Sequence, residues 1–150
     1  MDTETADSIK EGTLVKVTGV KAEWAGEVAI MDATVEVLGE TKTFEATDVT
    51  DVISDSEKLA TYMNQKIAMK GLEVVEVSVK DSEYDPDLYI TCKLGDTEVN
   101  LCVENYLTGP DTEVYMTGKD LVAGDVIDVE GFLYWYEGAN PHVTSISVVK

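Results

Sequence analysis

Alternating apolar and polar residues, the pattern typical of half-buried β-strands, recur along most of the chain. Clusters of Gly, Asn, Asp and Pro interrupt the alternation at short intervals, as expected of turns between neighbouring strands. The pattern therefore predicts a mostly β protein, with strands at 12–20, 28–37, 66–79, 88–94, 97–107, 124–132 and 141–149.

One segment, 54–65, predicts a helix instead of a strand. Ser54 or Asp55 can cap its first turn, where acidic side chains also interact favourably with the helix dipole. Its apolar residues recur at the spacing of one helix face. We therefore expect one helix just before the long strand 66–79, with an apolar face made of Leu59, Tyr62 and Met63.

Two strands in the middle of the chain are joined by Gly95-Asp96, a two-residue signal for a tight hairpin. A two-residue loop fixes the register and gathers the apolar side chains on one face. Cys102 then lies on the face opposite Cys92, so we expect no disulfide between them and interpret both as small buried hydrophobic residues. The predicted pairs are Cys92 with Val99, Ile90 with Leu101 and Leu88 with Val103.

Part of the pattern occurs twice. Residues 12–20 match residues 124–132, and each segment has a glycine at the same place, Gly19 and Gly131. In both copies a turn and a second strand follow. A glycine inside an alternating strand indicates a bulge or a sharp bend, where a side chain would not fit. Strongly bent strands are what small closed barrels require.

From residue 66 onward, the predicted order is a long bent strand, a two-stranded hairpin, a connection, a second bent strand and a last strand. With the glycine-bearing strands Ile67–Gly71 and Val126–Gly131 and the run Leu121–Asp125, this order resembles the OB-fold, a five-stranded Greek-key barrel. The likeness covers about 57–150. This segment is similar to tRNA-anticodon-binding-like OB modules, which occur in tandem in secreted or lipid-anchored bacterial proteins. The connection 108–123 contains Gly109-Pro110 and is expected to be irregular, with at most a short helical turn, although the OB-fold often has a helix there.

We therefore expect an all-β fold with one helix, made of two parts. Residues 54–150 form the five-stranded barrel and its preceding helix, and residues 1–53 form a β-hairpin that resembles the last two strands of another OB-like unit. In an alternative, the strands of 13–51 and the helix begin a first barrel that strand 66–79 closes. The internal repeat favours the hairpin. Because an isolated two-stranded hairpin is marginally stable in water, we expect it to pack on the barrel or to self-associate.

Charge narrows the expected partners. The chain has 30 acidic residues against 11 basic ones, all of them lysine, for a net charge of −19. Such a surface repels phosphates and anionic membranes, so we expect neither nucleic acid nor membrane insertion. The polar start lacks the basic and apolar regions of a signal peptide. We expect an extracellular or cell-surface setting for a mature fragment, with a cytoplasmic one left open.

Aromatic residues suggest a ligand-binding face. Tyr134, Trp135 and Tyr136 crowd one strand and turn, and Trp24 lies at the corresponding turn of the first repeat. Aromatic side chains stack on bases or sugar rings. The alternative is that alternate members of the cluster fill the barrel and the others cover its outside.

Metal binding and catalysis have weaker signals. An acidic loop could hold Ca²⁺ through alternating carboxylates, although it lacks the EF-hand glycine and final glutamate. His142 has no partner constellation in the sequence and is interpreted as a surface or strand-edge histidine. We expect no cofactor, no other metal and no enzyme activity. The calcium candidates are Asp81, Glu83, Asp85 and Asp87, and the carboxylate pairs considered for acid catalysis are Glu73 with Glu76 and Asp128 with Glu130.

These observations favour a non-catalytic binding or interaction module of a larger, extracellular bacterial protein, with a protein or glycan as ligand. The alternative is an OB-fold that binds single-stranded nucleic acid, which the fold analogy suggests and the charge opposes.

Overall fold

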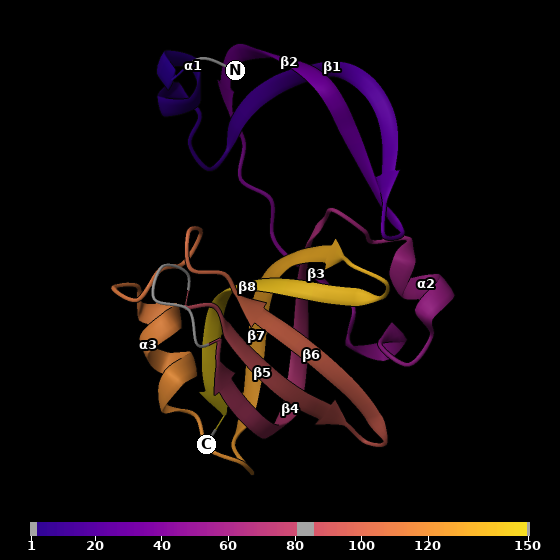
Figure 1. The fold of residues 1–150 in the computed structure, drawn as a ribbon, viewed down its shortest axis with the longest axis vertical. Coiled ribbons are helices and arrows are strands. Elements are labelled where there is room, and N and C mark those ends of the chain that lie inside the picture. Colours follow the sequence, from indigo (N-terminus) through magenta and orange to yellow (C-terminus); the bar gives the residue numbers. More distant parts are fainter. Residues whose placement is uncertain (1–2, 81–85, 150) are drawn as a thin grey trace. The chain divides into compact units, whose positions relative to one another are not determined.

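The computed structural model describes residues 3–80 and 86–149, and the chain divides into two compact units between Glu45 and Ala46. We call residues 1–45 unit 1 and residues 46–150 unit 2 (Figure 1). Unit 1 contains α1 (Thr3–Ser8), β1 (Thr13–Trp24) and β2 (Glu27–Thr41). Unit 2 contains β3 (Thr47–Asp48), the 3₁₀ turn η1 (Thr50–Val52), α2 (Ser56–Ala60), β4 (Lys66–Val79), β5 (Leu88–Leu94), β6 (Thr97–Val103), α3 (Glu113–Asp120), β7 (Val126–Trp135) and β8 (Ala139–Val149).

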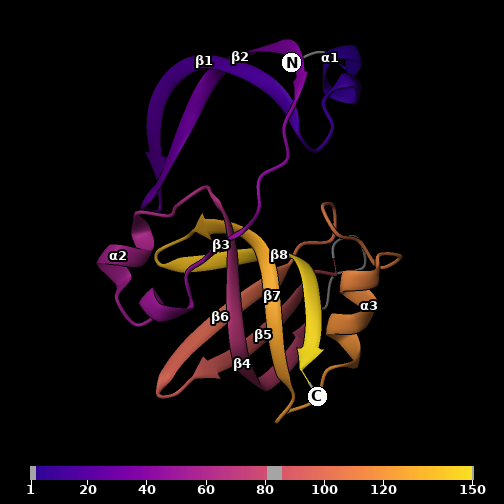
Figure 2. The same cartoon turned by 180° about the vertical axis from the view of Figure 1, so that it is seen from behind.

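Unit 2 is a closed barrel of five strands in the order β4–β5–β6–β8–β7, with β7 pairing back to β4 (Figure 2). Strand β4 closes the barrel because its first half pairs with β7 and its second half with β5. It bends at Gly71, whose φ of 69° is a left-handed value that favours glycine. Counted from β4, the strand order is the Greek key of the OB-fold. The expected fold class, an all-β barrel of this kind plus a separate N-terminal hairpin, is confirmed.

Alternate residues of the strands fill the barrel. In β5, Leu88, Ile90 and Cys92 are buried, and the residues between them are exposed or half-buried. This is the side-chain period of two that the sequence pattern shows. The largest fully buried side chains include Ile67, Met69, Leu72, Leu88, Ile90, Leu101, Ile127 and Leu133.

The β5–β6 hairpin has the predicted register, which is therefore confirmed. Neither Cys92 nor Cys102 is part of a disulfide; Cys92 faces the core, and Cys102 pairs with Tyr89 on the other face. Burial raises the pKa of the Cys92 thiol to about 12, so it stays protonated and unreactive at neutral pH. The confirmed pairs are Cys92 with Val99, Ile90 with Leu101 and Leu88 with Val103.

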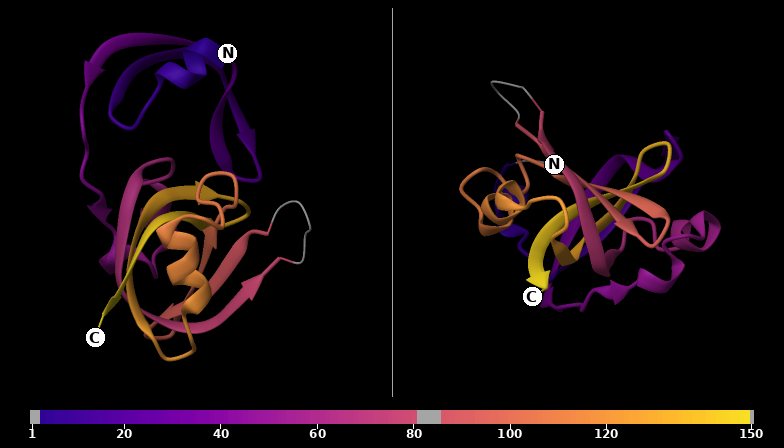
Figure 3. Two further views of the ribbon diagram at one scale, coloured as in Figure 1. Left: turned by 90° about the vertical axis from the view of Figure 1, so that its left-hand side faces the viewer. Right: turned by 90° about the horizontal axis from the view of Figure 1, so that it is seen from below.

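Helix α3 lies between the third and fourth barrel strands, where the sequence predicted an irregular connection with at most a helical turn (Figure 3). The Thr112 hydroxyl caps it by accepting a hydrogen bond from the backbone N–H of Tyr115, at 3.3 Å. Val114 and Tyr115 are buried in the core, and Gly118 packs closely on side chains of β5 and β8. The helix is short and contains a glycine, so tertiary packing rather than intrinsic propensity stabilises it.

The segment before β4 belongs to the barrel unit. Strand β3 pairs with β4 in parallel, and Val49 and Ile53 are only 1% and 7% exposed. Both side chains are part of the hydrophobic core, which explains why the division falls after Glu45 and not at the expected position between 53 and 54. Helix α2 is shorter than predicted, with Asp55 as its N-cap.

The alternative first barrel is not formed. Among the described residues, β1 and β2 pair only with each other, in a two-stranded sheet. Strand β4 pairs with β3, β5 and β7.

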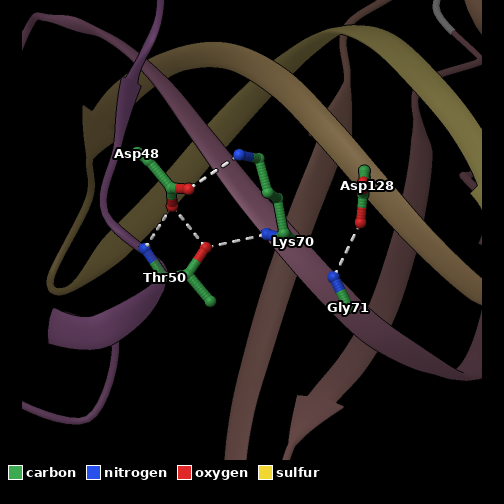
Figure 4. Close-up of polar contacts among 5 residues, drawn as sticks. All are labelled: Asp48, Thr50, Lys70, Gly71 and Asp128. Atoms are coloured by element: carbon green, nitrogen blue, oxygen red, sulfur yellow. Dashed lines mark hydrogen bonds and ion pairs between the residues drawn. The ribbon is translucent and has the colours of Figure 1, made fainter.

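Side chains from two neighbouring segments hold the bend of β4 (Figure 4). A bulge leaves backbone N–H groups without a partner in the ladder. Here the Thr50 hydroxyl oxygen accepts from Lys70 N–H at 2.9 Å, and Asp128 accepts from Gly71 N–H at 2.8 Å. Asp48 accepts from the backbone N–H and hydroxyl of Thr50 at 3.0 and 2.6 Å, and its other oxygen lies 2.9 Å from Lys70 Nζ. The bend is therefore fixed by β3, η1 and β7 together.

An Asp48→Asn variant is expected to lose stability at neutral pH but not in acid. Hydrogen bonds from Thr50 and Lys70 lower the pKa of Asp48 from 3.8 to about 2. Because its pKa is lower in the folded state, Asp48 contributes fully above about pH 4, and the contribution disappears as the pH falls towards 2. The side chain is 46% exposed, so solvent screening limits the effect to about 1 kcal/mol.

Urea unfolding of the wild type and of Asp48→Asn, at about pH 6 and at about pH 2.5, measures this difference. Asp96→Asn, in the exposed β5–β6 turn, is the matched control. A stability difference that is the same at both pH values contradicts the assignment.

Candidate functional site

A cavity of about 500 Å³ lies on the outer face of the barrel, and residues of unit 2 alone line it. They come from β5, β6, β7 and β8 and from the segments next to them. Four carry rings: Tyr89, Tyr134, Tyr136 and His142. The others are Asp87, Cys102, Glu104, Leu107 and Asn140.

Strand register brings these distant residues together. Tyr89 pairs with Cys102 across β5 and β6, and Cys102 pairs with His142 in the parallel contact of β6 and β8. Tyr134 pairs with Asn140 in the β7–β8 hairpin. Paired residues on adjacent strands point to the same side of a sheet. The barrel therefore presents one continuous row of side chains on its outside.

His142 forms a wall of the cavity. Its Nδ1 lies 3.1 Å from a carboxylate oxygen of Glu104, which fits a hydrogen bond donated by the ring N–H. Its ring centroid is 4.6 Å from that of Tyr134, with 36° between the planes. The side chains of His142 and Glu104 are only 15% and 18% exposed. These contacts hold Tyr134 and His142 in one arrangement, which the sequence interpretation of a strand-edge histidine did not include.

Two other ring side chains stay accessible. Tyr89 is 38% exposed and Tyr136 is 54% exposed. The backbone N–H of Tyr136 donates to Gly138 at 2.9 Å, which fixes the β7–β8 turn that carries this ring. Leu107, 60% exposed, adds an apolar edge. The cavity therefore offers flat apolar surface to a ligand.

Asp87 supports the cavity but is not open to solvent. It is 7% exposed and accepts a hydrogen bond from the backbone N–H of Asn105 at 2.9 Å, and its other oxygen is 4.0 Å from Lys80 Nζ. It is the only calcium candidate in the described part of the chain; Asp81, Glu83 and Asp85 lie outside it. Within residues 3–80 and 86–149, no group of three or more His, Cys, Asp or Glu side chains is placed to hold a metal ion.

The four predicted aromatic residues separate. Tyr134 and Tyr136 line the cavity, whereas Trp135 packs against the hydrophobic core. Trp24 belongs to unit 1, at the end of β1, and is 69% exposed. Sequence reasoning missed Tyr89, although the predicted hairpin register already placed it outside the barrel, opposite Cys102.

Three of the four carboxylates considered for acid catalysis, Glu73, Asp128 and Glu130, have structural partners. Glu73 lies 2.9 Å from Lys93, and Glu130 lies 3.8 Å from Lys66. Asp128 binds the N–H of Gly71 at the bend of β4. A smaller cavity of about 200 Å³ runs beside Asp128 and Glu130. These contacts explain the side chains as supports of the barrel.

In the described part of the chain, no helix is long and apolar enough to cross a membrane.

Known proteins resemble this chain only in structure. No family model matches the sequence, and no curated protein does. Asparaginyl-tRNA synthetase from Pyrococcus horikoshii matches with a TM-score of 0.51 and 18% identity, over 71% of this chain and 23% of that one. The same enzyme complexed with asparaginyl-adenylate matches with a TM-score of 0.48 and 18% identity, over 60% and 20%. The chain thus spans about a quarter or less of these enzymes, and the first match shows a shared fold.

This likeness corrects one expectation. From the charge of −19, nucleic acid was expected not to be a partner. That expectation is contradicted, because the fold is shared with an enzyme named for tRNA. Charge alone is not a sufficient argument, since stacking of bases on aromatic rings does not need a basic surface.

Proposed function

We propose that unit 2 is a non-catalytic OB-type binding module and that its cavity binds single-stranded nucleic acid by base stacking. The observation that carries the proposal is the grouping of Tyr89, Tyr134, Tyr136 and His142 in one cavity. In the OB-fold, ligands bind on the face of the second and third strands, between the loop after the first strand and the loop before the last. Those elements here are β5 with Asp87 just before it, β6, and the β7–β8 turn.

Stacking has to supply the affinity. No lysine lines the cavity, and Asp87 and Glu104 add negative charge to it. A base stacked on an aromatic ring contributes about 1–3 kcal/mol. Two stacked bases therefore give a weak complex, with a dissociation constant of about 0.04–30 mM. Because the protein repels phosphates, added salt is expected to strengthen this binding, the reverse of the usual dependence.

A second candidate ligand is a cationic segment of a polypeptide. The observation in its favour is the pair of carboxylates beside the rings: Glu104 lies against His142, and Asp87 is near Tyr89 in the chain and in the cavity. A lysine or arginine side chain placed over tyrosine gains a cation–π interaction. Salt would weaken this complex. The extracellular setting and the parent protein remain predictions from the sequence.

A Tyr136→Ala variant is expected to lose at least about fivefold in affinity for oligothymidylate, because one stacked base loses its ring. Tyr136 is half exposed in a turn, so the barrel is expected to stay folded. NMR titration with an oligomer of about ten nucleotides measures the change. Phe44→Ala, which removes an even more exposed ring from unit 1, is the control and should bind like the wild type.

The same titrations at about 50 and 500 mM NaCl separate the two ligands. Oligothymidylate bound in the cavity more tightly at high salt supports the proposal. Binding of an oligolysine peptide that salt weakens and Tyr136→Ala reduces, with no response to oligothymidylate, favours the cationic polypeptide instead. Shifts that do not involve Tyr89, Tyr134 or His142 contradict this site for either ligand.

A further inference from the structure

Residues of unit 1 repeat the geometry of the last third of unit 2. In unit 2, helix α3 is followed by a turn at Gly124, with φ of 94°, and then by the β7–β8 hairpin. In unit 1, helix α1 is followed by a turn at Gly12, with φ of 85°, and then by the β1–β2 hairpin. Two glycines in the same rare conformation therefore connect the same kinds of element in the same order.

The turns share their hydrogen bonds as well. Adding 112 to each residue number of unit 1 gives its counterpart in unit 2, with the same donor and acceptor positions. This agreement includes a side-chain cap, in which a threonine in one unit and an aspartate in the other accept from the backbone. The bond from Ile9 N to Ala6 O matches that from Leu121 N to Gly118 O, and the bond from Thr13 N to Lys10 O matches that from Asp125 N to Val122 O. In the side-chain cap, the bond from Lys10 N to Thr13 Oγ1 matches that from Val122 N to Asp125 Oδ2.

The two hairpins also have the same register. Adding 112 to the β1 numbers and 111 to the β2 numbers converts eight pairs of the β1–β2 ladder into eight pairs of the β7–β8 ladder. A register shift falls at the same place in both, at Gly19 and at Gly131. A β-carbon at Gly19 would lie 2.5 Å from the carbonyl oxygen of Met31, and one at Gly131 would collide with that of His142. The bend itself is therefore repeated.

The corresponding faces differ in burial. In β7, Ile127 and Val129 are 0% and 3% exposed, because β4, β5 and β6 complete the barrel around them. Their counterparts in β1 are Val15 and Val17, which pair with Val37 and Val35 to make an apolar strip. Val17 is 41% exposed. The strip is chemically like a barrel interior but is not buried like one.

We propose that α1, β1 and β2 are the C-terminal half of a second OB-like barrel, and that their valine strip docks a three-stranded antiparallel β-sheet from a polypeptide outside residues 1–150. Unit 2 shows how such a sheet is seated. Its first strand, β4, pairs antiparallel with β7, and its third, β6, lies parallel to β8. The partner sheet would pair with β1 and β2 in the same way and cover the strip with its apolar face. This inference does not depend on the ligand of unit 2.

Two positions define the chemistry of the partner. By the same offsets in number, Lys21 corresponds to Leu133 and Asp32 to Val143, and both of these residues of unit 2 are buried. Charged groups at an interface need partners of opposite charge. The docking sheet is therefore expected to carry an acidic residue against Lys21 and a basic one against Asp32. A second copy of this chain fits less well, because two hairpins supply four strands and the barrel has five.

The repeat itself supplies a probe. The probe is a fusion in which a second copy of residues 46–114 is joined directly before Thr3. The copied β4, β5 and β6 then precede β1 and β2 by the same number of residues by which the original strands precede β7 and β8. Amide hydrogen exchange of β1 and β2 is compared between the chain 1–150 and this fusion. We expect at least about tenfold slower exchange in the fusion, on the edges of β1 and β2 that gain partners. A second fusion carries Lys21→Leu, because the copied sheet packs on Leu133 at this position in unit 2 and has no reason to pair with the charge of Lys21.

Each outcome decides the proposal. Slower exchange in either fusion, lost again when Gly19→Val blocks the bend, supports it. Unchanged exchange in both fusions overturns it. Light scattering that finds the chain 1–150 as a dimer with protected β1 and β2 amides also overturns it, because a second copy is then the occupant.

Discussion

A Gly131→Ala variant is expected to be about 3 kcal/mol less stable than the wild type, a large loss for one methyl group. The added β-carbon would collide with the carbonyl oxygen of His142 and would lie 2.9 Å from Cα of Val143. Both are backbone atoms of the paired strand β8, so neither can rotate away as a side chain could. The two strands have to separate at the bend that closes the barrel.

Gly138→Ala is the matched control, in the same hairpin. A β-carbon there meets no atom within 4 Å, so we expect a change below about 0.5 kcal/mol. Urea unfolding of both variants gives the comparison. Because His142 forms a wall of the cavity, Gly131→Ala should also alter the NMR signals of Tyr134. Equal stability of the two variants would show that β8 adjusts and that the glycine is not required.

The barrel was predictable because its determinants are local. The turn Gly95-Asp96 sets the β5–β6 register, and a period of two then decides which side chains enter the core. The repeated glycines marked the bends at Gly19 and Gly131. These signals lie within a few residues of the structure that they specify.

The first residues of unit 2 were not predictable in the same way. Val49 and Ile53 lie in a short strand and a turn, where no periodic pattern forms, and they become core residues only through the pairing of β3 with β4. Helix α3 likewise depends on packing, since Gly118 weakens its intrinsic propensity but allows close approach to β5 and β8. Both features are set by contacts between distant segments.

The cavity shows the same limit. Sequence reasoning found Tyr134 and Tyr136 because they are adjacent to Trp135, and it could not assign which of the three faces the core. The parallel contact of Cys102 with His142 joins strands that are 40 residues apart and are not connected by a single tight turn. No local sequence pattern therefore predicts it. That contact brings Tyr89 to the other aromatic side chains.

Removal of residues 1–53 is expected to destabilise unit 2 strongly, whereas removal of residues 1–45 is not. All members of the hydrophobic core lie within 46–150. The longer deletion takes Val49 and Ile53 out of that core, at about 2–3 kcal/mol each. It also removes Asp48 and Thr50, which hold the bend of β4.

The expected difference between the two fragments is thus about 5 kcal/mol, comparable to the whole stability of a small domain. Thermal unfolding of fragments 46–150 and 54–150 measures it, and Val49→Ala in the full chain, at about 2 kcal/mol, shows the same effect without cutting the backbone. If fragment 54–150 unfolds cooperatively at the same temperature as fragment 46–150, the segment before β4 is not part of the folding unit. Asp128 must then hold the bend of β4 without Thr50, whose hydroxyl oxygen accepts from the N–H of Lys70 in the full chain.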